Sequence, residues 1–448
     1  MGLLVGSAPV APERLDRPFQ DPLVRRLFPP LATGVHWGLE RTEQALAALG
    51  NPHRAYPTLH VGGTNGKGSV TTTLASVLRH DGRRTGCYTS PHLCSFRERI
   101  LIDGRPLTED ALVDRAREIH DVVIGCGLTF FEAVTVLAFH VFAREQVDFA
   151  VMEVGLGGRL DSTNVIVPEV AAVTNIAMDH SDFLGDTIEE IAREKAGIMK
   201  RDVPFVTAEQ APGTRAVFEE VAREVGAPLS YVELDAVRDV VVGADGTSFL
   251  METGTWGTIE VHTPLVGRHQ ATNAALAVSV LDHLPAGRRP AKDALLRGIA
   301  EVEYHGRDEL ERIDGVTWLL DVAHNTAGVR SLVDTIDTLR LPRPHAALVG
   351  VLGDKDWAAM LPPLFERVDV AVLTQPPTAP PERRWDPAAA AARAGGSNRV
   401  EVEEDFVRAF ERAKAAAQGG TVVVTGSVHT VGGVMRLLGR QPLRRFDE

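Results

Sequence analysis

The sequence contains few cysteines, and their arrangement does not build a site. Only three are present among 448 residues, at Cys87, Cys94 and Cys126. They form neither a CxxC pair nor a spacing typical of metal ligands. A disulfide framework and a zinc or iron–sulfur site built on cysteine are therefore excluded, and we expect reduced thiols.

Long apolar runs and targeting signals are also lacking. No apolar stretch approaches the roughly 20 residues that a membrane-spanning helix needs. The start of the chain, Met1 to Val10, is apolar but short, contains glycines and is followed by Glu13 and Arg14. It has neither the basic segment nor the long apolar core of a secretory signal. We expect a cytoplasmic protein with no membrane partner.

Charges of one sign do not gather in a long run, and the formal net charge is −13. An acidic chain gains little from phosphate-backbone contacts, which excludes nucleic acid as a general partner but leaves room for a local anion site. The length of 448 residues is too great for one core and suits two α/β domains. We place these domains at residues 1–299 and 300–448.

Strand, loop and helix alternate through the first domain. Residues 59–61 form a short run that enters a glycine loop, and the following segment has apolar residues at helical spacing. Residues 147–153 and 170–176 are continuous apolar runs, which are typical of buried parallel strands. Residues 129–145 have the length and spacing of a helix.

Residues 228–264 differ from this pattern, since they are rich in Val, Thr and Gly and contain turn signals at 244–246 and 253–254. They predict antiparallel hairpins, followed by a helix at about 269–284.

The alternation resumes in the second domain. Its predicted strands are 316–321, 346–351, 368–373 and 420–425, and its predicted helices are 326–340, 356–366 and 403–417. The sequence therefore predicts an α/β fold: a P-loop-type, doubly wound, mostly parallel sheet with a small antiparallel β addition, then a smaller Rossmann-like domain.

The segment from Gly62 to Ser69 (GGTNGKGS) is the strongest local signal, because it lies between a predicted strand and a predicted helix. Glycines let backbone amides surround a phosphate, the helix N-terminus adds positive potential, and Lys67 adds a charge. The segment departs from the standard P-loop pattern, because Gly68 separates Lys67 from Ser69. It favours phosphate binding over a plain glycine turn.

Polar residues also follow several predicted strands. Glu153 ends a buried strand, where a Mg²⁺ ligand is expected beside a phosphate loop, and His180 follows another strand. Taken alone, a strand-end Glu or a loop His is more often an ordinary hydrogen-bonded residue than a metal ligand. Asp321 ends a strand of the second domain and is either a ligand contact or a helix cap. Ser427 and His429 follow the last strand in the same way, without the G-x-S-x-G motif of a hydrolase.

Lys195 stands on an apolar helix face. Thr187 and Glu190 form a capping box that starts this helix, and the lysine lies on the stripe begun by Ile188 and Ile191. A lysine there either extends its ammonium to solvent or is drawn into a site.

Together these motifs resemble the folylpolyglutamate synthase and dihydrofolate synthase family of the Mur ligase superfamily. The resemblance rests on nine segments in order: Trp37 to Arg41 (WGLER), Gly63 to Ser69 (GTNGKGS), Thr89 to Leu93 (TSPHL), Glu153 to Asp161 (EVGLGGRLD), Arg193 to Ile198 (REKAGI), His269 to Ala274 (HQATNA), Asp321 to Asn325 (DVAHN), Asp354 to Asp356 (DKD) and Gly426 to Thr430 (GSVHT).

The resemblance implies an ATP-dependent ligase that joins L-glutamate to a folate-type carboxylate. Implied ATP contacts are Thr64, Asn65, Gly66, Lys67, Gly68, Ser69, Asn273, Arg307 and Asp321. Implied Mg²⁺ ligands are Ser90, Glu153, His180 and Lys195, the last as a carbamylated lysine. The implied folate contacts are Thr129, Phe131, Leu160, Asp161 and Ser162, and the implied glutamate contacts are His324, Ser427 and His429. Lys67, Lys195, His180 and His324 would act in catalysis.

One departure is His305-Gly306-Arg307, where the family usually has Pro-Gly-Arg. The resemblance further implies folate or dihydropteroate and L-glutamate as substrates, and we expect a monomer. Two rival functions stay open at this point: a Mur-type ligase for a cell-wall precursor, and a P-loop nucleotide-binding protein without ligase activity.

Overall fold

The computed structural model describes residues 22–28, 38–393 and 399–447. Its contacts divide these residues into two compact units, one ending at Tyr304 and the other beginning at His305. Each unit is an α/β structure built on a mostly parallel sheet, as predicted. The domain boundary between residues 299 and 300 stays a prediction, and Trp37 of the first motif lies outside the described residues.

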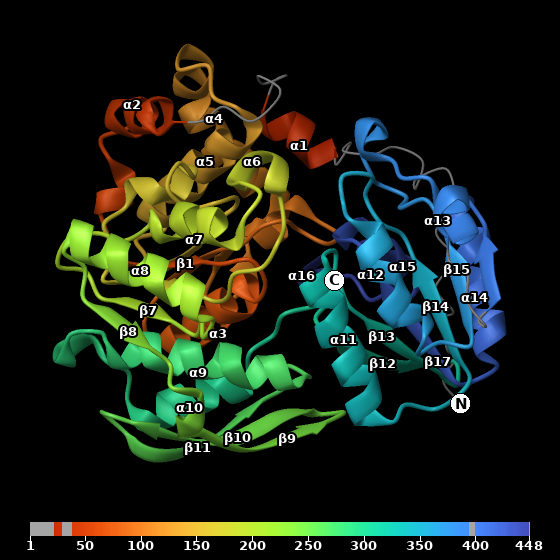
Figure 1. The fold of residues 1–448 in the computed structure, drawn as a ribbon. Coiled ribbons are helices and arrows are strands. Elements are labelled where there is room, and N and C mark those ends of the chain that lie inside the picture. The colour runs from red at the N-terminus through yellow and green to blue at the C-terminus, as the bar shows by residue number, and fades with distance from the viewer. Residues whose placement is uncertain (1–21, 29–37, 394–398, 448) are drawn as a thin grey trace, which may run out of the picture. The chain divides into compact units, whose positions relative to one another are not determined.

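An eight-stranded sheet forms the centre of the first unit, in the order β4-β3-β2-β5-β1-β6-β7-β8 (Figure 1). Neighbours from β2 to β8 in this order pair in parallel, whereas β3 and β4 are antiparallel at one edge. The strands are β1 (Thr58–Gly62), β2 (Thr85–Tyr88), β3 (Ile100–Ile102), β4 (Arg105–Pro106), β5 (Phe149–Glu153), β6 (Val170–Val173), β7 (Phe205–Thr207) and β8 (Leu229–Tyr231).

Helices cover this sheet because its central strands are buried on both faces. One core joins β1 to α3 (Lys67–His80), α9 (Arg268–Asp282) and α10 (Lys292–Ala300). Two further cores contain α4 (Glu109–Gly125) with α5 (Phe130–Arg144), and α7 (Ile188–Ala196) with α8 (Pro212–Val225). Within β1, Leu59 and Val61 belong to the first core, and His60 between them points to the other face.

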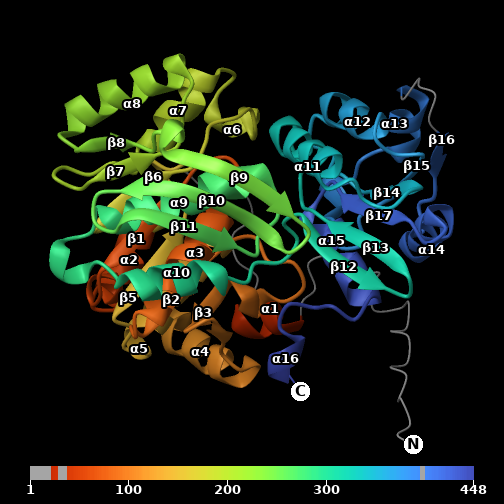
Figure 2. The ribbon, with the colours of Figure 1, turned by 90° about the horizontal axis from the view of Figure 1, so that it is seen from below.

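The predicted antiparallel addition is present as β9 (Val237–Gly243), β10 (Gly246–Thr253) and β11 (Gly257–Thr263), which lie beside α9 and α10 (Figure 2). The hairpin prediction was wrong for residues 229–231. These form β8, which pairs in parallel with β7 in the large sheet. Since α8 connects β7 to β8, the segment completes a strand–helix–strand unit, which places its second strand parallel to the first.

The second unit has a six-stranded sheet in the order β12-β13-β17-β14-β15-β16, with β12 antiparallel to β13. The predicted strands are present as β13 (Val316–Leu320), β14 (His345–Val349), β15 (Val370–Leu373) and β17 (Thr421–Thr425). The predicted helices are present as α11 (Thr326–Leu339), α12 (Trp357–Phe365) and α14 (Phe406–Ala417).

The sequence reading missed β12 (Glu309–Ile313), β16 (Arg399–Val402), α13 (Pro387–Arg393) and α15 (Val428–Leu437). Both missed strands are edge strands that alternate charged and apolar residues, so they lack the continuous apolar run that marked the others. Shorter helices complete the described chain: α1 (Pro22–Leu27), α2 (Glu40–Ala48), α6 (Ser181–Leu184) and α16 (Arg444–Asp447). Across the described ranges, no helix has both the length and the apolar character needed to cross a membrane.

Candidate active site

The glycine loop after β1 is held in a fixed shape by the end of β6. Gly63 has φ of 134°, and a Cβ there would lie 1.9 Å from the Thr174 Oγ1 atom, so only glycine fits. The Thr64 amide donates to the Asn175 carbonyl at 2.8 Å, and the Asn65 amide donates to the Asn175 side chain at 2.9 Å. Contacts within the protein therefore define the shape of this loop.

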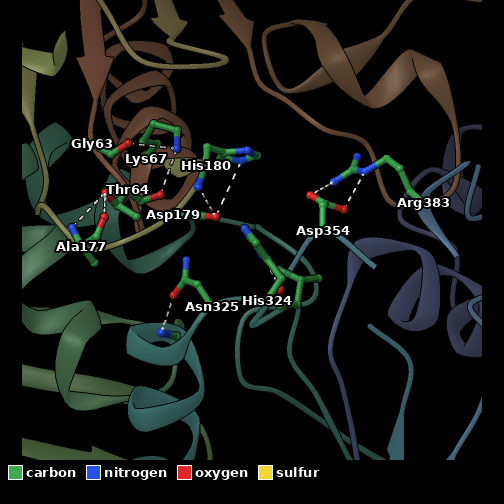
Figure 3. Close-up of polar contacts among 12 residues, drawn as sticks. Gly63, Thr64, Lys67, Ala177, Asp179, His180, His324, Asn325, Asp354 and Arg383 are labelled. Atoms are coloured by element: carbon green, nitrogen blue, oxygen red, sulfur yellow. Dashed lines mark hydrogen bonds and ion pairs between the residues drawn. The ribbon is translucent and has the colours of Figure 1, made fainter. Parts of the chain in front are cut away.

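Two lysines meet at one carbonyl of this loop. The Lys67 ammonium donates to the carbonyls of Gly63 at 3.1 Å and Thr64 at 3.0 Å (Figure 3). The Lys195 ammonium donates to the same Gly63 carbonyl at 2.8 Å. Two positive groups thus share one neutral acceptor, and this arrangement favours the arrival of an anion.

Lys195 is buried, which decides between the two alternatives that its place on the apolar stripe left open. Thr187 and Glu190 form the predicted capping box of α7, and the lysine is only 5 % exposed, so an ammonium extended to solvent is wrong. Burial, together with the smaller effect of the Lys67 charge, lowers the pKa of Lys195 to about 7. Asp179 and Asp161 act in the opposite direction. A large share of this amine is therefore neutral at neutral pH.

Other predicted nucleotide contacts surround the same loop. The Ser69 hydroxyl is buried and has no hydrogen-bond partner among the described residues, which leaves it for a ligand. Asn273 packs on Gly66, where an added Cβ would lie 2.5 Å from the Asn273 side-chain oxygen. Gly68 is covered by Tyr304, whose hydroxyl would lie 2.0 Å from a Cβ at position 68. This contact explains why glycine stands where the standard P-loop has Ser or Thr.

Two of the four predicted metal ligands are in contact. The buried Glu153 carboxylate accepts a hydrogen bond from the Ser90 amide at 2.9 Å. His180 begins α6 with φ of 54°, and its Nε2 atom lies 3.9 Å from the Asp179 carboxylate (Figure 3). No group of three His, Cys, Asp or Glu side chains within the described part of the chain is arranged to hold a metal. The predicted set contains two such residues, Glu153 and His180, and is completed by a serine hydroxyl and a modified lysine.

The predicted folate contacts gather around the second glycine loop, residues 155–158. An added Cβ at Gly155 would lie 2.2 Å from the Phe131 ring, so this ring packs directly on the loop. Thr129 caps α5, and its amide and hydroxyl donate to the Glu132 carboxylate at 2.7 and 2.8 Å. Arg41 donates to the other oxygen of the same carboxylate at 2.8 Å and so holds the Glu132 side chain at the start of α5.

The Asp161 carboxylate joins the second glycine loop to Thr163 in the turn that follows it. One oxygen accepts from the amides of Gly155 at 3.1 Å and Leu156 at 2.9 Å. The other accepts from the Thr163 amide at 3.0 Å and the Thr163 hydroxyl at 2.5 Å. Ser162 beside it is buried and Leu160 is partly exposed. Four donors fill the acceptor positions of one carboxylate, and the Gly155 and Leu156 amides therefore face the protein.

In the second unit, Asp321 organises the turn that carries Arg307. Its carboxylate accepts from the amides of Asp308 at 3.0 Å and Ala323 at 2.8 Å. The alternative that it caps a helix is wrong, because Asn325 is the N-cap of α11. Asp308 is itself buried, and its carboxylate accepts a hydrogen bond from the Thr335 hydroxyl. Burial, together with the nearby Asp321 carboxylate, raises the pKa of Asp308 well above the ordinary value.

The predicted glutamate contacts are held by the second unit's own backbone. The Ser427 hydroxyl caps α15 and donates to the Gly350 carbonyl at 2.8 Å. The His324 Nδ1 atom lies 2.9 Å from the Val322 carbonyl, and His429 Nδ1 lies 2.8 Å from the Thr378 hydroxyl. Burial lowers the pKa of His429 to about 4, assisted by the charges of Arg383 and Arg436. His429 is therefore neutral at neutral pH.

Sequence reasoning missed three polar residues that shape these sites: His60, Thr163 and Asp308. His60 was read as part of an apolar strand, although a histidine inside a fully buried run is itself a signal of a polar network. Asp308 follows Arg307 directly, but its burial depends on α11 packing over it, which the sequence does not state.

Comparison with known proteins gives consistent results. The Mur ligase middle domain matches residues 61–281, and the Mur ligase glutamate ligase domain matches residues 306–428. Dihydrofolate synthase/folylpolyglutamate synthase of Mycobacterium tuberculosis is 35% identical, with 92% of each chain covered.

Two solved structures have the same fold. Folylpolyglutamate synthase of M. tuberculosis complexed with ADP superposes with a TM-score of 0.85 at 34% identity, covering 94% of this chain and 98% of that one. An E. coli structure in complex with DHPP and ADP gives a TM-score of 0.82 at 33% identity, covering 93% and 96%. With these matches over most of its length, the chain belongs to the folylpolyglutamate synthase and dihydrofolate synthase family of ATP-dependent Mur ligases.

Proposed function

We propose that this protein uses ATP to join L-glutamate to the carboxylate of a folate-type substrate, acting both as folylpolyglutamate synthase and as dihydrofolate synthase. The observation that carries the proposal is the meeting of Lys67 and Lys195 at the Gly63 carbonyl of the phosphate loop. A plain nucleotide-binding loop needs only the first of these lysines. The names of the relatives disfavour both a cell-wall ligase and a nucleotide-binding protein without ligase activity.

A carboxylate is a poor acyl donor, so the reaction begins with its activation. One carboxylate oxygen attacks the γ-phosphorus of ATP, ADP leaves, and an acyl phosphate forms. In our proposal, Lys67 leaves its carbonyl partners and neutralises the charge that develops on the transferred group. The glutamate amine then attacks the acyl carbon, and phosphate leaves with the oxygen that came from the substrate carboxylate.

The donor set at the Ser90–Glu153 contact fits a hard cation, because Mg²⁺ prefers a few oxygen ligands and keeps several waters. Ser90, Glu153 and His180 would hold the ion, and its charge would stabilise the phosphoryl group in transfer. We also propose that Lys195 is carbamylated. A neutral amine reacts with CO₂, and the product would replace the repulsion between Lys195 and Lys67 by attraction.

We assign the substrate sides by residue. Phe131, with Thr129, Leu160, Asp161 and Ser162, would form the pteroate side around the second glycine loop. His324, Ser427 and His429 would form the glutamate side. Asn273, Arg307 and Asp321 would contact the nucleotide together with residues 64–69. We further propose a monomer acting in the cytoplasm, where its three thiols would stay reduced.

Mass spectrometry of the products tests both activities. The purified protein is incubated with ATP, Mg²⁺ and L-glutamate, and with either dihydropteroate or tetrahydrofolate as acceptor. We expect dihydrofolate from the first mixture and a glutamyl-extended tetrahydrofolate from the second. Extension of tetrahydrofolate without formation of dihydrofolate would refute the proposed dihydrofolate synthase activity. Absence of both products would refute the whole proposal. D-glutamate serves as the matched control for the amine.

A further inference from the structure

We infer that His60, a residue outside every predicted contact set, is a positioning residue that fixes the second glycine loop of the pteroate side through Thr163 and Asp161. The inference deepens the proposed function and rests on it only for the identity of the substrate. The structural part, a polar relay from β1 to residues 155–156, stands on the contacts alone.

The relay begins inside the sheet. His60 lies in the middle of β1 and is fully buried, with backbone pairing to both β5 and β6. Its Nε2 atom lies 2.8 Å from the Thr163 hydroxyl, in the short helical turn Ser162–Val165. Burial lowers the pKa of His60 to about 3, so the ring is neutral under working conditions.

The direction of each hydrogen bond follows from the partners. The Thr163 hydroxyl donates to the Asp161 carboxylate at 2.5 Å, because an ionised carboxylate only accepts. This hydroxyl therefore accepts from His60, which must carry its proton on Nε2. The Nδ1 atom is then a bare acceptor, in agreement with the absence of any partner for it among the described residues.

The relay ends on the loop that the Phe131 ring covers. Asp161 accepts from the Gly155 and Leu156 amides with its second oxygen, at 3.1 and 2.9 Å. Gly155 is in contact with the Phe131 ring, so the loop position decides where that ring can lie. A shift of Thr163 moves Asp161, and a shift of Asp161 releases the amides that shape this loop.

His60 also connects this loop to the phosphate loop. It lies two residues before Gly62, where β1 passes into the segment that carries Lys67. The relay thus fixes the loop at the end of β5 to the strand that carries the phosphate loop. Consecutive hydrogen bonds in a buried chain of this kind polarise one another and are thereby strengthened.

Matched pairs of variants test the relay. In His60→Gln the amide nitrogen reaches the place of Nε2 and keeps the donor, whereas in His60→Asn it reaches only the place of Nδ1. Thr163→Ser keeps the hydroxyl, and Thr163→Val removes it at nearly the same volume. Amide hydrogen exchange of residues 154–158, measured by mass spectrometry without substrate, should be on the order of tenfold faster in His60→Asn and Thr163→Val than in their partners.

Steady-state kinetics supplies the second measurement. We expect the KM for dihydropteroate to rise on the order of tenfold in His60→Asn and Thr163→Val. The KM for ATP should stay within about twofold, and His60→Gln and Thr163→Ser should resemble the wild type. The relay would be overturned if His60→Gln and His60→Asn showed equal amide hydrogen exchange in residues 154–158 and an equal KM for dihydropteroate. A parallel rise of both KM values in every variant would also overturn it, since that result indicates general destabilisation.

The two proposals fail in different ways. Wild-type protein that does not act on either folate acceptor would refute the proposed function. The exchange measurement would still decide whether His60 positions the loop. Conversely, an active wild type with identical exchange in all four variants would leave the function standing and remove the inference.

Discussion

Lys195, in the unit that ends at Tyr304, and Ser427, in the unit that begins at His305, are both buried but are satisfied differently. Lys195 shares the Gly63 carbonyl as hydrogen-bond acceptor with the ammonium of Lys67. Ser427 caps α15 and donates to the Gly350 carbonyl, so its hydroxyl both donates and accepts within the fold. The first arrangement is improved by a ligand or a modification, and the second is already complete.

This contrast predicts whether a substitution should change mainly activity or also stability. Residues of the phosphate loop hold charge that is balanced only when an anion is bound, so their replacement should reduce activity far more than stability. Residues of the second unit's predicted glutamate side serve the fold as well, so their replacement should reduce stability too. The following predictions test this contrast, beginning with the largest expected effect.

Lys67→Ala should abolish turnover and leave stability unchanged or slightly increased. One charge–phosphate contact in a dry site contributes several kcal/mol to the transition state, so kcat/KM should fall on the order of 10²-fold or more. Removing the ammonium also ends its repulsion with Lys195. Steady-state kinetics and thermal unfolding check both statements, with the exposed Lys292→Ala as control. Unchanged kcat/KM in a folded variant would contradict the assignment.

Lys195→Ala should also be inactive, and small carboxylates should partly restore it. If the working group is a carbamate, acetate or formate can occupy the space and replace its negative charge, whereas methylamine cannot. The amine has a pKa of about 7, so the neutral form that reacts with CO₂ predominates as the pH rises above 7. Rescue by methylamine and not by acetate would instead indicate a cationic lysine.

His60 should make the protein less stable in acid. The folded state keeps its imidazole neutral with a pKa of about 3, against an ordinary value of 6.5. Between these values the unfolded chain binds a proton that the folded chain does not. The free energy of unfolding therefore falls as the pH is lowered from 6.5 toward 3, by up to about 1.4 kcal/mol per pH unit.

His60→Gln removes this contribution and should flatten the dependence over the same pH window. Chemical denaturation at several pH values measures it, and His120→Gln on the exposed side of α4 is the matched control. A slope unchanged by His60→Gln would mean that the imidazole already accepts a proton in the folded state.

Ser427→Ala should reduce both stability and glutamate binding, because this hydroxyl is already fully hydrogen-bonded within the fold. Loss of an N-cap and of a buried hydrogen bond costs about 1–2 kcal/mol of stability. We expect a lower denaturation midpoint together with a higher KM for glutamate. A change in KM with no loss of stability would mean that the hydroxyl serves the substrate alone, and the contrast between the units would fail. Ser331→Ala, at a half-buried position of α11 where the hydroxyl donates to the Ala327 carbonyl, provides a control for serine replacement.

Sequence patterns predicted the features that depend on residues close together in the chain. The phosphate loop, the capping box at Thr187 and the place of Lys195 on an apolar helix face all follow from spacing along one helix or one loop. Convergence on Gly63 could not be predicted, because Lys195 is 132 positions from it in the sequence. The relay through His60 was missed for the same reason, since its partner Thr163 is 103 positions away.

The turn at His305 shows how a changed residue is compensated. In place of the family's proline, the His305 Nδ1 atom lies 2.8 Å from the Glu309 carboxylate, which also accepts from the Gly306 amide at 2.7 Å. The resemblance could flag this departure but could not supply its compensation, because β12, which contains Glu309, was not predicted.

Isotope transfer tests the central claim most directly. The carboxylate of dihydropteroate is labelled with ¹⁸O, and the phosphate released during glutamate-dependent turnover is analysed by mass spectrometry. Activation as an acyl phosphate predicts that each phosphate carries one oxygen from the carboxylate, because the bond from phosphorus to that oxygen forms in the first step and survives the second. Phosphate without the label, at a rate of release equal to product formation, would contradict the account.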